Sequence, residues 1–200
     1  MRILVVGTGG VGSAFAGIAQ RRSFFEHCAL ADYDPARPET VVERLDDRRF
    51  SSHRIDASSK EDVVRLIREV HADAVLNAVD PIFDLPIFEA CLEARATYLD
   101  MAMSLSRPHP ERPYDECGVK LGDEQFERAQ AWEDAGLLAL VGIGIEPGAA
   151  DVFARYAADE LFSRSRRSAS GTARTSRSRA TSSRRPSRSG QPSRSASTHR

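Results

Sequence analysis

The fold of this 200-residue chain is decided by the stretch Arg2-Ile-Leu-Val-Val-Gly-Thr-Gly-Gly-Val-Gly-Ser-Ala-Phe-Ala-Gly17. An apolar, strand-like run leads directly into Gly7-x-Gly9-x-x-Gly12 and then into a segment of small, helix-compatible residues. Gly7 allows a tight exit from the strand, Gly9 lets a pyrophosphate approach the backbone, and Gly12 lets the helix pack closely on the strand. The N–H groups of such a turn lie at the positive end of a helix dipole and attract an anion. We therefore expect a dinucleotide pyrophosphate to bind at Gly7, Thr8, Gly9, Gly10, Val11 and Gly12.

An acidic residue stands where a dinucleotide site needs one. Asp32 follows Gly12 by 20 positions and ends the next apolar run. Its carboxylate is expected to accept hydrogen bonds from the adenosine ribose, and its charge favours NAD over NADP. Arg37 is close enough in sequence to reach a 2′-phosphate, so the cofactor is predicted as NAD or NADP.

Strand-like and helix-like segments alternate along the rest of the chain. Strands are expected over 3–6, 28–31, 52–55, 73–77, 97–99 and 137–141. Helices are expected over 12–22, 38–44, 60–71, 85–94, 123–135 and 149–162. Regular alternation of this kind predicts right-handed crossovers and an α/β doubly wound parallel sheet of the Rossmann type.

Ligands of such sheets bind beyond the carboxyl ends of the strands, which directs attention to the residues that follow each strand. Asp56 either lies beside the adenine or caps the next helix together with Ser58 and Ser59. Small residues near the second half of the cofactor permit close approach, and we expect contacts at Asn77, Ala78 and Val79.

Two further acidic residues follow predicted strands, and the sequence alone does not assign a role to either. Asp100 is either catalytic or, more commonly for a carboxylate at this place, a helix cap or surface group. Glu146, in the turn Gly142-Ile-Gly-Ile-Glu-Pro-Gly148, either orients a substrate amine or belongs to a rigid connection. No histidine has a visible catalytic partner in the sequence, so the catalytic residues stay unassigned.

The chain resembles the saccharopine dehydrogenase family. Its first glycine turn, Asn77-Ala78, Tyr98-Leu-Asp-Met-Ala102 and Gly144-Ile-Glu-Pro-Gly148 look like the family's pattern, with Glu146 in place of Asp. The resemblance covers residues 1 to about 162 and implies hydride transfer between NAD(P) and an amino acid or amine. It implies a dinucleotide domain over residues 1–162, and in the family a substrate domain follows.

The sequence after residue 162 does not follow that pattern. Residues 164–200 hold 11 of the 28 basic residues, 12 serines and no acidic residue, which leaves 17 basic against 29 acidic residues before them. With 26 Arg and two Lys the codons are expected to be GC-rich, and reading Glu-Ile codons one nucleotide late gives Arg-Ser. Our hypothesis is that residues 163–200 are a disordered, frameshifted remnant in place of the substrate domain, which leaves a chain that binds the dinucleotide without turnover.

The alternative takes this tail as real. A segment rich in Arg and Ser binds nucleic-acid phosphates, but no aromatic residue is interleaved to stack on bases, so we do not favour a nucleic-acid partner. Cys28, Cys91 and Cys117 show no metal-ligand spacing, and no metal is expected. Without an apolar run of about 18 residues or a cleavable leader, the chain is expected to be cytoplasmic with no membrane segment. A homo-oligomer is compatible with the sequence.

Overall fold

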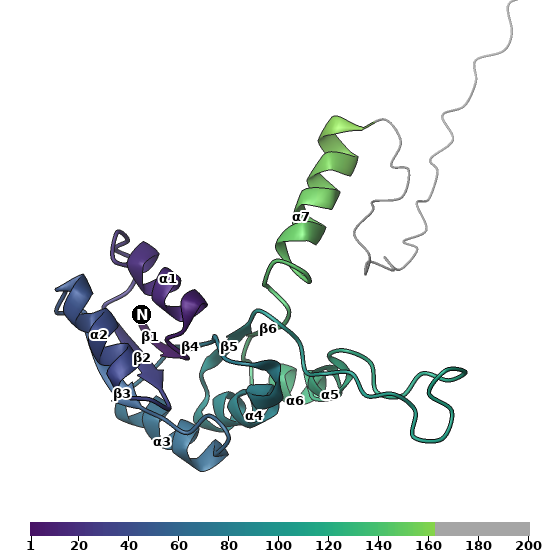
Figure 1. Ribbon diagram of the computed structural model, residues 1–200, viewed down its shortest axis with the longest axis horizontal. Helices are drawn as coiled ribbons and strands as arrows, with labels where there is room; N and C mark the ends of the chain where they lie inside the picture. The colour runs from purple at the N-terminus through teal and green to yellow at the C-terminus, as the bar shows by residue number, and fades with distance from the viewer. Residues whose placement is uncertain (163–200) are drawn as a thin grey trace, which may run out of the picture. The chain divides into compact units, whose positions relative to one another are not determined.

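The computed structural model describes residues 1–162 (Figure 1). The disordered tail expected over residues 163–200 lies outside the described residues. No helix within residues 1–162 has the length and apolar character needed to cross a membrane.

Six parallel strands form one sheet in the order β3-β2-β1-β4-β5-β6. The central strand β1 pairs with β2 and β4, with Ile3 opposite Cys28 on one side and opposite Ala74 on the other. The strands are β1 (Arg2–Val6), β2 (His27–Asp32), β3 (Phe50–Arg54), β4 (Ala74–Asn77), β5 (Thr97–Asp100) and β6 (Ala139–Leu140). This order places the switch point, where the chain direction across the sheet reverses, between β1 and β4.

Helices cover both faces of the sheet (Figure 1). They are α1 (Gly10–Ala19), α2 (Ala36–Leu45), α3 (Lys60–Glu69), α4 (Asp84–Ala94), α5 (Asp123–Phe126), α6 (Ala129–Asp134) and α7 (Ala149–Tyr156), with short helical turns η1 (Pro81–Phe83) and η2 (Ala157–Leu161). The α/β doubly wound parallel sheet predicted from the sequence is thus confirmed.

The core lies in two layers because the side chains of a strand alternate between the two faces of the sheet. Leu4 and Val6 pack with residues of α3 and α4 on one face. Ile3 and Val5 pack with residues of α1 and α2 on the other face. Since β1 contributes to both layers, it is buried along most of its length, and the turn that follows it is held on a rigid support.

Several predicted boundaries differ from the observed ones. The helix expected over 12–22 begins earlier, at Gly10. The helix expected over 123–135 is divided into α5 and α6. The strand expected over 137–141 is reduced to Ala139–Leu140, because the Leu137 N–H donates to the Trp132 carbonyl and completes the end of α6.

Candidate functional site

The turn after β1 is closely packed against its neighbours. Gly7 has φ +97°, and a Cβ there would lie 2.7 Å from the carbonyl oxygen of Ala78. Its N–H donates to the Ala31 carbonyl at 2.8 Å. A Cβ on Gly12 would lie 1.9 Å from the Gly7 carbonyl oxygen, so only glycine lets α1 approach β1 this closely. The roles expected for Gly7 in the strand exit and for Gly12 in helix packing are therefore confirmed.

The outward side of the same turn is open. A Cβ on Gly9 or Gly10 would meet no protein atom within 4 Å. The first intrahelical bond runs from the Ser13 N–H to the Gly9 carbonyl at 3.0 Å, so the N–H groups before it have no acceptor within the helix. The first turn of α1 has no acidic residue to neutralise the dipole. This end of α1 therefore fits the pyrophosphate of a dinucleotide.

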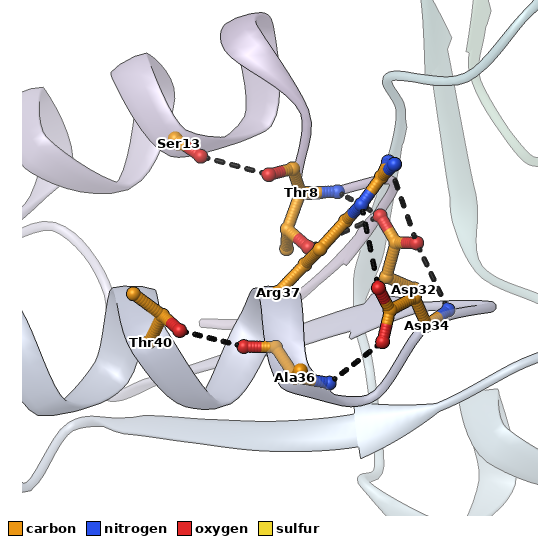
Figure 2. A network of polar contacts seen from close by, with 7 residues as sticks. All are labelled: Thr8, Ser13, Asp32, Asp34, Ala36, Arg37 and Thr40. Atoms are coloured by element: carbon orange, nitrogen blue, oxygen red, sulfur yellow. Dashed lines mark hydrogen bonds and ion pairs between the residues drawn. The ribbon is translucent and has the colours of Figure 1, made fainter.

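Asp32 ties the end of β2 to the glycine turn (Figure 2). Its Oδ2 accepts hydrogen bonds from the Thr8 backbone N–H at 2.8 Å and from the Thr8 hydroxyl at 3.1 Å. The Ser13 hydroxyl donates to the Thr8 carbonyl at 2.8 Å, so Thr8 is held from both sides. One carboxylate oxygen of Asp32 thus fixes the turn, and Oδ1 is directed toward Arg37.

A cation stands beside Asp32. The guanidinium of Arg37 lies 4.0 Å from Asp32 Oδ1 and 3.8 Å from Asp34 Oδ2 (Figure 2). The Arg37 side chain is 60% exposed, so it can move away from the two carboxylates without losing a buried contact. Its charge partly offsets the repulsion that Asp32 exerts on an anion.

An open crevice of about 620 Å³ runs along the carboxyl ends of β1, β2, β3 and β4, a volume typical of small-molecule sites. The predicted residues that line it are Gly7, Gly9, Asp32, Asp56, Ala78 and Val79. Other lining residues were not expected at the site. Ser58 was considered only as part of a helix cap, and Tyr33, Asp80 and Phe83 were given no role. Tyr33 was recognisable from its place directly after Asp32, whereas Phe83 belongs to η1, which sequence reasoning did not identify.

Of the two interpretations of Asp56, the helix cap is wrong, because Ser59 caps α3. Asp56 lines the crevice, and its Oδ1 accepts hydrogen bonds from the N–H and the hydroxyl of Ser58 at 3.0 and 2.6 Å. These hydrogen bonds hold the pKa of the Asp56 carboxyl below its usual value. The helix itself is capped by Ser59, whose hydroxyl accepts from the Asp62 N–H at 3.2 Å.

Asn77 does not line the crevice. Its side chain is 2% exposed, and Nδ2 donates to Asp84 Oδ1 at 2.7 Å and to the Tyr98 hydroxyl at 3.1 Å. Its Oδ1 accepts from the Val79 N–H at 3.2 Å, so Asn77 positions a crevice residue from behind. Burial, followed by the charge of Asp100, raises the pKa of Asp84 to about 7.

Asp100 is neither a helix cap nor a surface group, contrary to the interpretation that its position at a strand end favoured. It is 1% exposed at the end of β5. Its Oδ1 accepts from the Gly142 N–H at 2.6 Å, and Oδ2 accepts from the Gln125 side-chain amide at 2.7 Å. Sequence reasoning missed this role because the donors lie 25 and 42 positions away.

Within residues 1–162, no group of three or more His, Cys, Asp or Glu side chains is arranged to hold a metal ion. The described part of the chain therefore offers a crevice, a helix N-terminus free of acidic residues and a strand-end carboxylate beside an exposed cation. Together with the sheet order, these features define the class of the protein as a dinucleotide-binding α/β domain.

Comparison with known proteins gives the family. Residues 3–140 match the family of the saccharopine dehydrogenase NADP binding domain. The chain belongs to this family, and its cofactor is NAD(P). The resemblance stated from the sequence motifs is confirmed.

Curated relatives are considerably longer than this chain. Carboxynorspermidine synthase of Vibrio cholerae is 31% identical over 171 residues, which cover 81% of this chain and 40% of the relative. Carboxyaminopropylagmatine dehydrogenase of Synechocystis is 31% identical over 167 residues, covering 80% of this chain and 38% of the relative. The apo saccharopine dehydrogenase (L-Glu forming) of Saccharomyces cerevisiae has the same fold, with a TM-score of 0.60 at 14% identity; the match covers 80% of this chain and 31% of that one.

Proposed function

We propose that the dinucleotide binds across the switch point with its pyrophosphate on the N-terminal turn of α1. The contacts would come from the backbone of residues 7–12, and Asp32 Oδ1 would accept from a hydroxyl of the adenosine ribose. The adenine would lie in the crevice near Asp56, and Ala78 and Val79 would contact the part of the cofactor that crosses toward β4. The observation that carries the proposal is the open space outside Gly9 and Gly10 at this turn.

The proposed reaction is hydride transfer between NAD(P) and an amino acid or amine, with the nicotinamide supplying the hydride chemistry. It rests on the family and on relatives named for carboxynorspermidine and carboxyaminopropylagmatine. Turnover also requires a substrate that is positioned and shielded from water. The chain spans about 40% of the length of these relatives, so the reaction is proposed for the protein as a whole.

The test is a titration of the full chain with NADH and with NADPH, followed by nicotinamide fluorescence. Gly9→Leu should weaken both by about tenfold or more, because the side chain would fill the space that the pyrophosphate needs. Gly17→Leu is the matched control, since a Cβ at Gly17, on the same helix, also meets no protein atom within 4 Å. Binding of neither coenzyme to the wild type, or equal binding to Gly9→Leu, would contradict the proposal.

The remaining expectations also stand as proposals. We propose residues 1–162 as the dinucleotide domain, a cytoplasmic location, and self-association of the chain. The alternative function, nucleic-acid binding by residues 164–200, is favoured by their 11 Arg and 12 Ser residues alone. A filter-binding assay with and without that segment, at low and high salt, distinguishes the two.

A further inference from the structure

A buried polar network lies beyond the crevice, under the carboxyl ends of β4 and β5. Asn77 and Tyr98 connect Asp84 at one end of the network to Asp100 at the other. In a sheet of this strand order, the first three strands bind the adenosine half of the cofactor, and β4 to β6 lie under the other half. Asp100 therefore lies under the nicotinamide half of the proposed site.

Asp100 holds the turn that follows β6. Its side-chain Oδ1 accepts from the Gly142 N–H at 2.6 Å, and its main-chain carbonyl accepts from the Ile143 N–H at 3.0 Å. The turn also lies directly on the chain after β5, since a Cβ on Gly144 would lie 2.1 Å from the Met101 carbonyl oxygen. These contacts leave the turn little room to shift while Asp100 is in place.

The buried carboxylate of Asp100 accepts hydrogen bonds from three groups. The Gly142 N–H, the Gln125 amide and the Tyr98 hydroxyl all hydrogen-bond to it. Burial raises the pKa of Asp100, whereas these three hydrogen bonds lower it by favouring the charged form. A buried carboxylate is costly unless its hydrogen bonds are made, so the hydrogen bond from Gly142 both stabilises the Asp100 carboxylate and holds the turn.

We infer that Asp100 is a positioning residue that holds the Gly142–Gly148 turn against the nicotinamide half of the coenzyme. The inference rests on the proposed dinucleotide function and deepens it. Asp100 acts through the turn and does not touch the coenzyme itself. Its removal should therefore affect ligands that carry a nicotinamide and spare those that end at the pyrophosphate.

The test compares NADH with ADP on the full chain, using nicotinamide fluorescence for NADH and calorimetry for ADP. Asp100→Asn keeps the shape but replaces one carboxylate oxygen with an NH₂ group, which opposes either the Gly142 N–H or the Gln125 amide. Gln125 cannot adapt by rotating its amide, because its Oε1 already accepts from the Ser104 N–H at 2.8 Å. We expect NADH binding to weaken about tenfold, with a loss of fluorescence enhancement, and ADP binding to stay within about twofold.

Two further variants keep the inference falsifiable. Asp73→Asn is the matched control, because it makes the same change just before β4, at the opposite end of that strand, where the Asp73 Oδ2 accepts from the Arg2 N–H at 2.7 Å; the affinities for NADH and for ADP should both stay unchanged. Gly144→Ala displaces the turn and leaves the Asp100 carboxylate intact, so it should reproduce the selective loss even where Asp100→Asn fails to fold.

The outcomes distinguish failure of the proposed dinucleotide binding from failure of the positioning role of Asp100. A wild type that binds neither ligand defeats the proposed function itself. A wild type that binds ADP and NADH equally, with no change in nicotinamide fluorescence, overturns the role of the turn. The inference is also overturned where a folded Asp100→Asn or Gly144→Ala variant loses both ligands equally or neither.

Discussion

Gly12 shows how one missing side chain sets the geometry of the site. Gly12→Ala would place its Cβ 1.9 Å from the Gly7 carbonyl oxygen, so α1 must move away from β1. We expect a loss of about 1–3 kcal/mol in the free energy of unfolding, typical of overpacking, together with weaker NADH binding. Urea denaturation and an NADH titration check the two effects.

The matched control is Gly17→Ala, in the same helix. A Cβ at Gly17 meets no protein atom within 4 Å, so the alanine should raise stability by about 0.5–1 kcal/mol through helix propensity. Equal stability changes in the two variants would show that the approach of α1 to β1 is not what Gly12 provides.

Arg37 is expected to decide how well the site accepts a 2′-phosphate. A guanidinium beside Asp32 can pair with that phosphate and offset the carboxylate repulsion. Arg37→Ala should weaken NADPH by about tenfold and leave NADH within about twofold, as measured by fluorescence titration. Arg44→Ala is the control, because it removes the same charge from α2 at a residue that does not line the crevice. If both variants weaken NADPH binding equally, the effect of Arg37 comes from its charge alone and not from a contact with the 2′-phosphate.

Residue roles that depend on the backbone were readable from the sequence, and those that depend on side-chain partners were not. Gly7 and Gly12 belong to a motif whose spacing fixes the turn, so their roles follow from local geometry. Asn77 was expected at the cofactor, but its partners Asp84 and Tyr98 come from α4 and β5, and only the folded chain shows that they meet it.

Two strands share a polar cluster that should make the fold sensitive to acid. The Ser51 hydroxyl on β3 lies 2.8 Å from Nε2 of His27 on β2 and 2.8 Å from Nε2 of His53 on β3. Burial lowers the pKa of both histidines. The charges of Arg2 and His53 lower that of His27 further, and for His53 Glu69 opposes the burial effect while Arg65 adds to it.

Because the folded pKa values are depressed, the neutral imidazoles are favoured by the fold. Their contribution is fully present above the unfolded pKa of 6.5 and is lost as the pH falls below it. We expect the free energy of unfolding to fall between pH 7.5 and 5.5, and His27→Gln/His53→Gln to flatten that slope. His109→Gln, in the loop before α5, is the control, and a slope unchanged in the double variant would refute the assignment.

The first residue of α4 should act in the opposite direction. Burial, then the charge of Asp100, raises the pKa of Asp84 to about 7. Its contribution to stability is therefore full below the unfolded pKa of 3.8 and is lost as the pH rises toward 7. Asp84→Asn should leave stability nearly unchanged at pH 4 and raise it by about 4 kcal/mol at pH 8, as urea denaturation would show. A gain of the same size at both pH values would show that ionisation of Asp84 is not the cause.

The existence and type of most elements follow from hydrophobic periodicity, whereas their ends follow from contacts. The helix over Lys60–Glu69 was expected from Val63, Val64 and Ile67 on one face and from a serine cap. The ends of β6 depend on Trp132, which accepts a hydrogen bond from Leu137, and on the Gly142 turn held by Asp100. Such partners are distant in sequence and leave no periodic signal.

At the scale of the molecule, the strand order of the sheet follows from the right-handed connections between parallel strands more than from any one residue. Alternating strands and helices with right-handed crossovers leave few topologies, and a glycine turn after β1 selects the dinucleotide-binding one. The sequence therefore predicted the parallel sheet, and the crevice lies at the strand ends to which it directed attention. The network from Asn77 to Asp100 was not predictable, because it exists only where β4 and β5 end side by side.

The region after β6 should control self-association of the whole chain. None of the residues of α7 is buried, and Val152, Phe153 and Tyr156 are 67, 71 and 57% exposed. Large exposed apolar surfaces favour association, so sedimentation velocity should show species larger than a monomer whose share grows with concentration. Val152→Gln/Phe153→Gln keeps helix propensity and should shift the distribution toward monomer, whereas Ala154→Gln adds one polar side chain to the same helix and should not. A double variant that associates like the wild type would place the contact elsewhere, and a wild type that stays monomeric at every concentration would contradict the prediction.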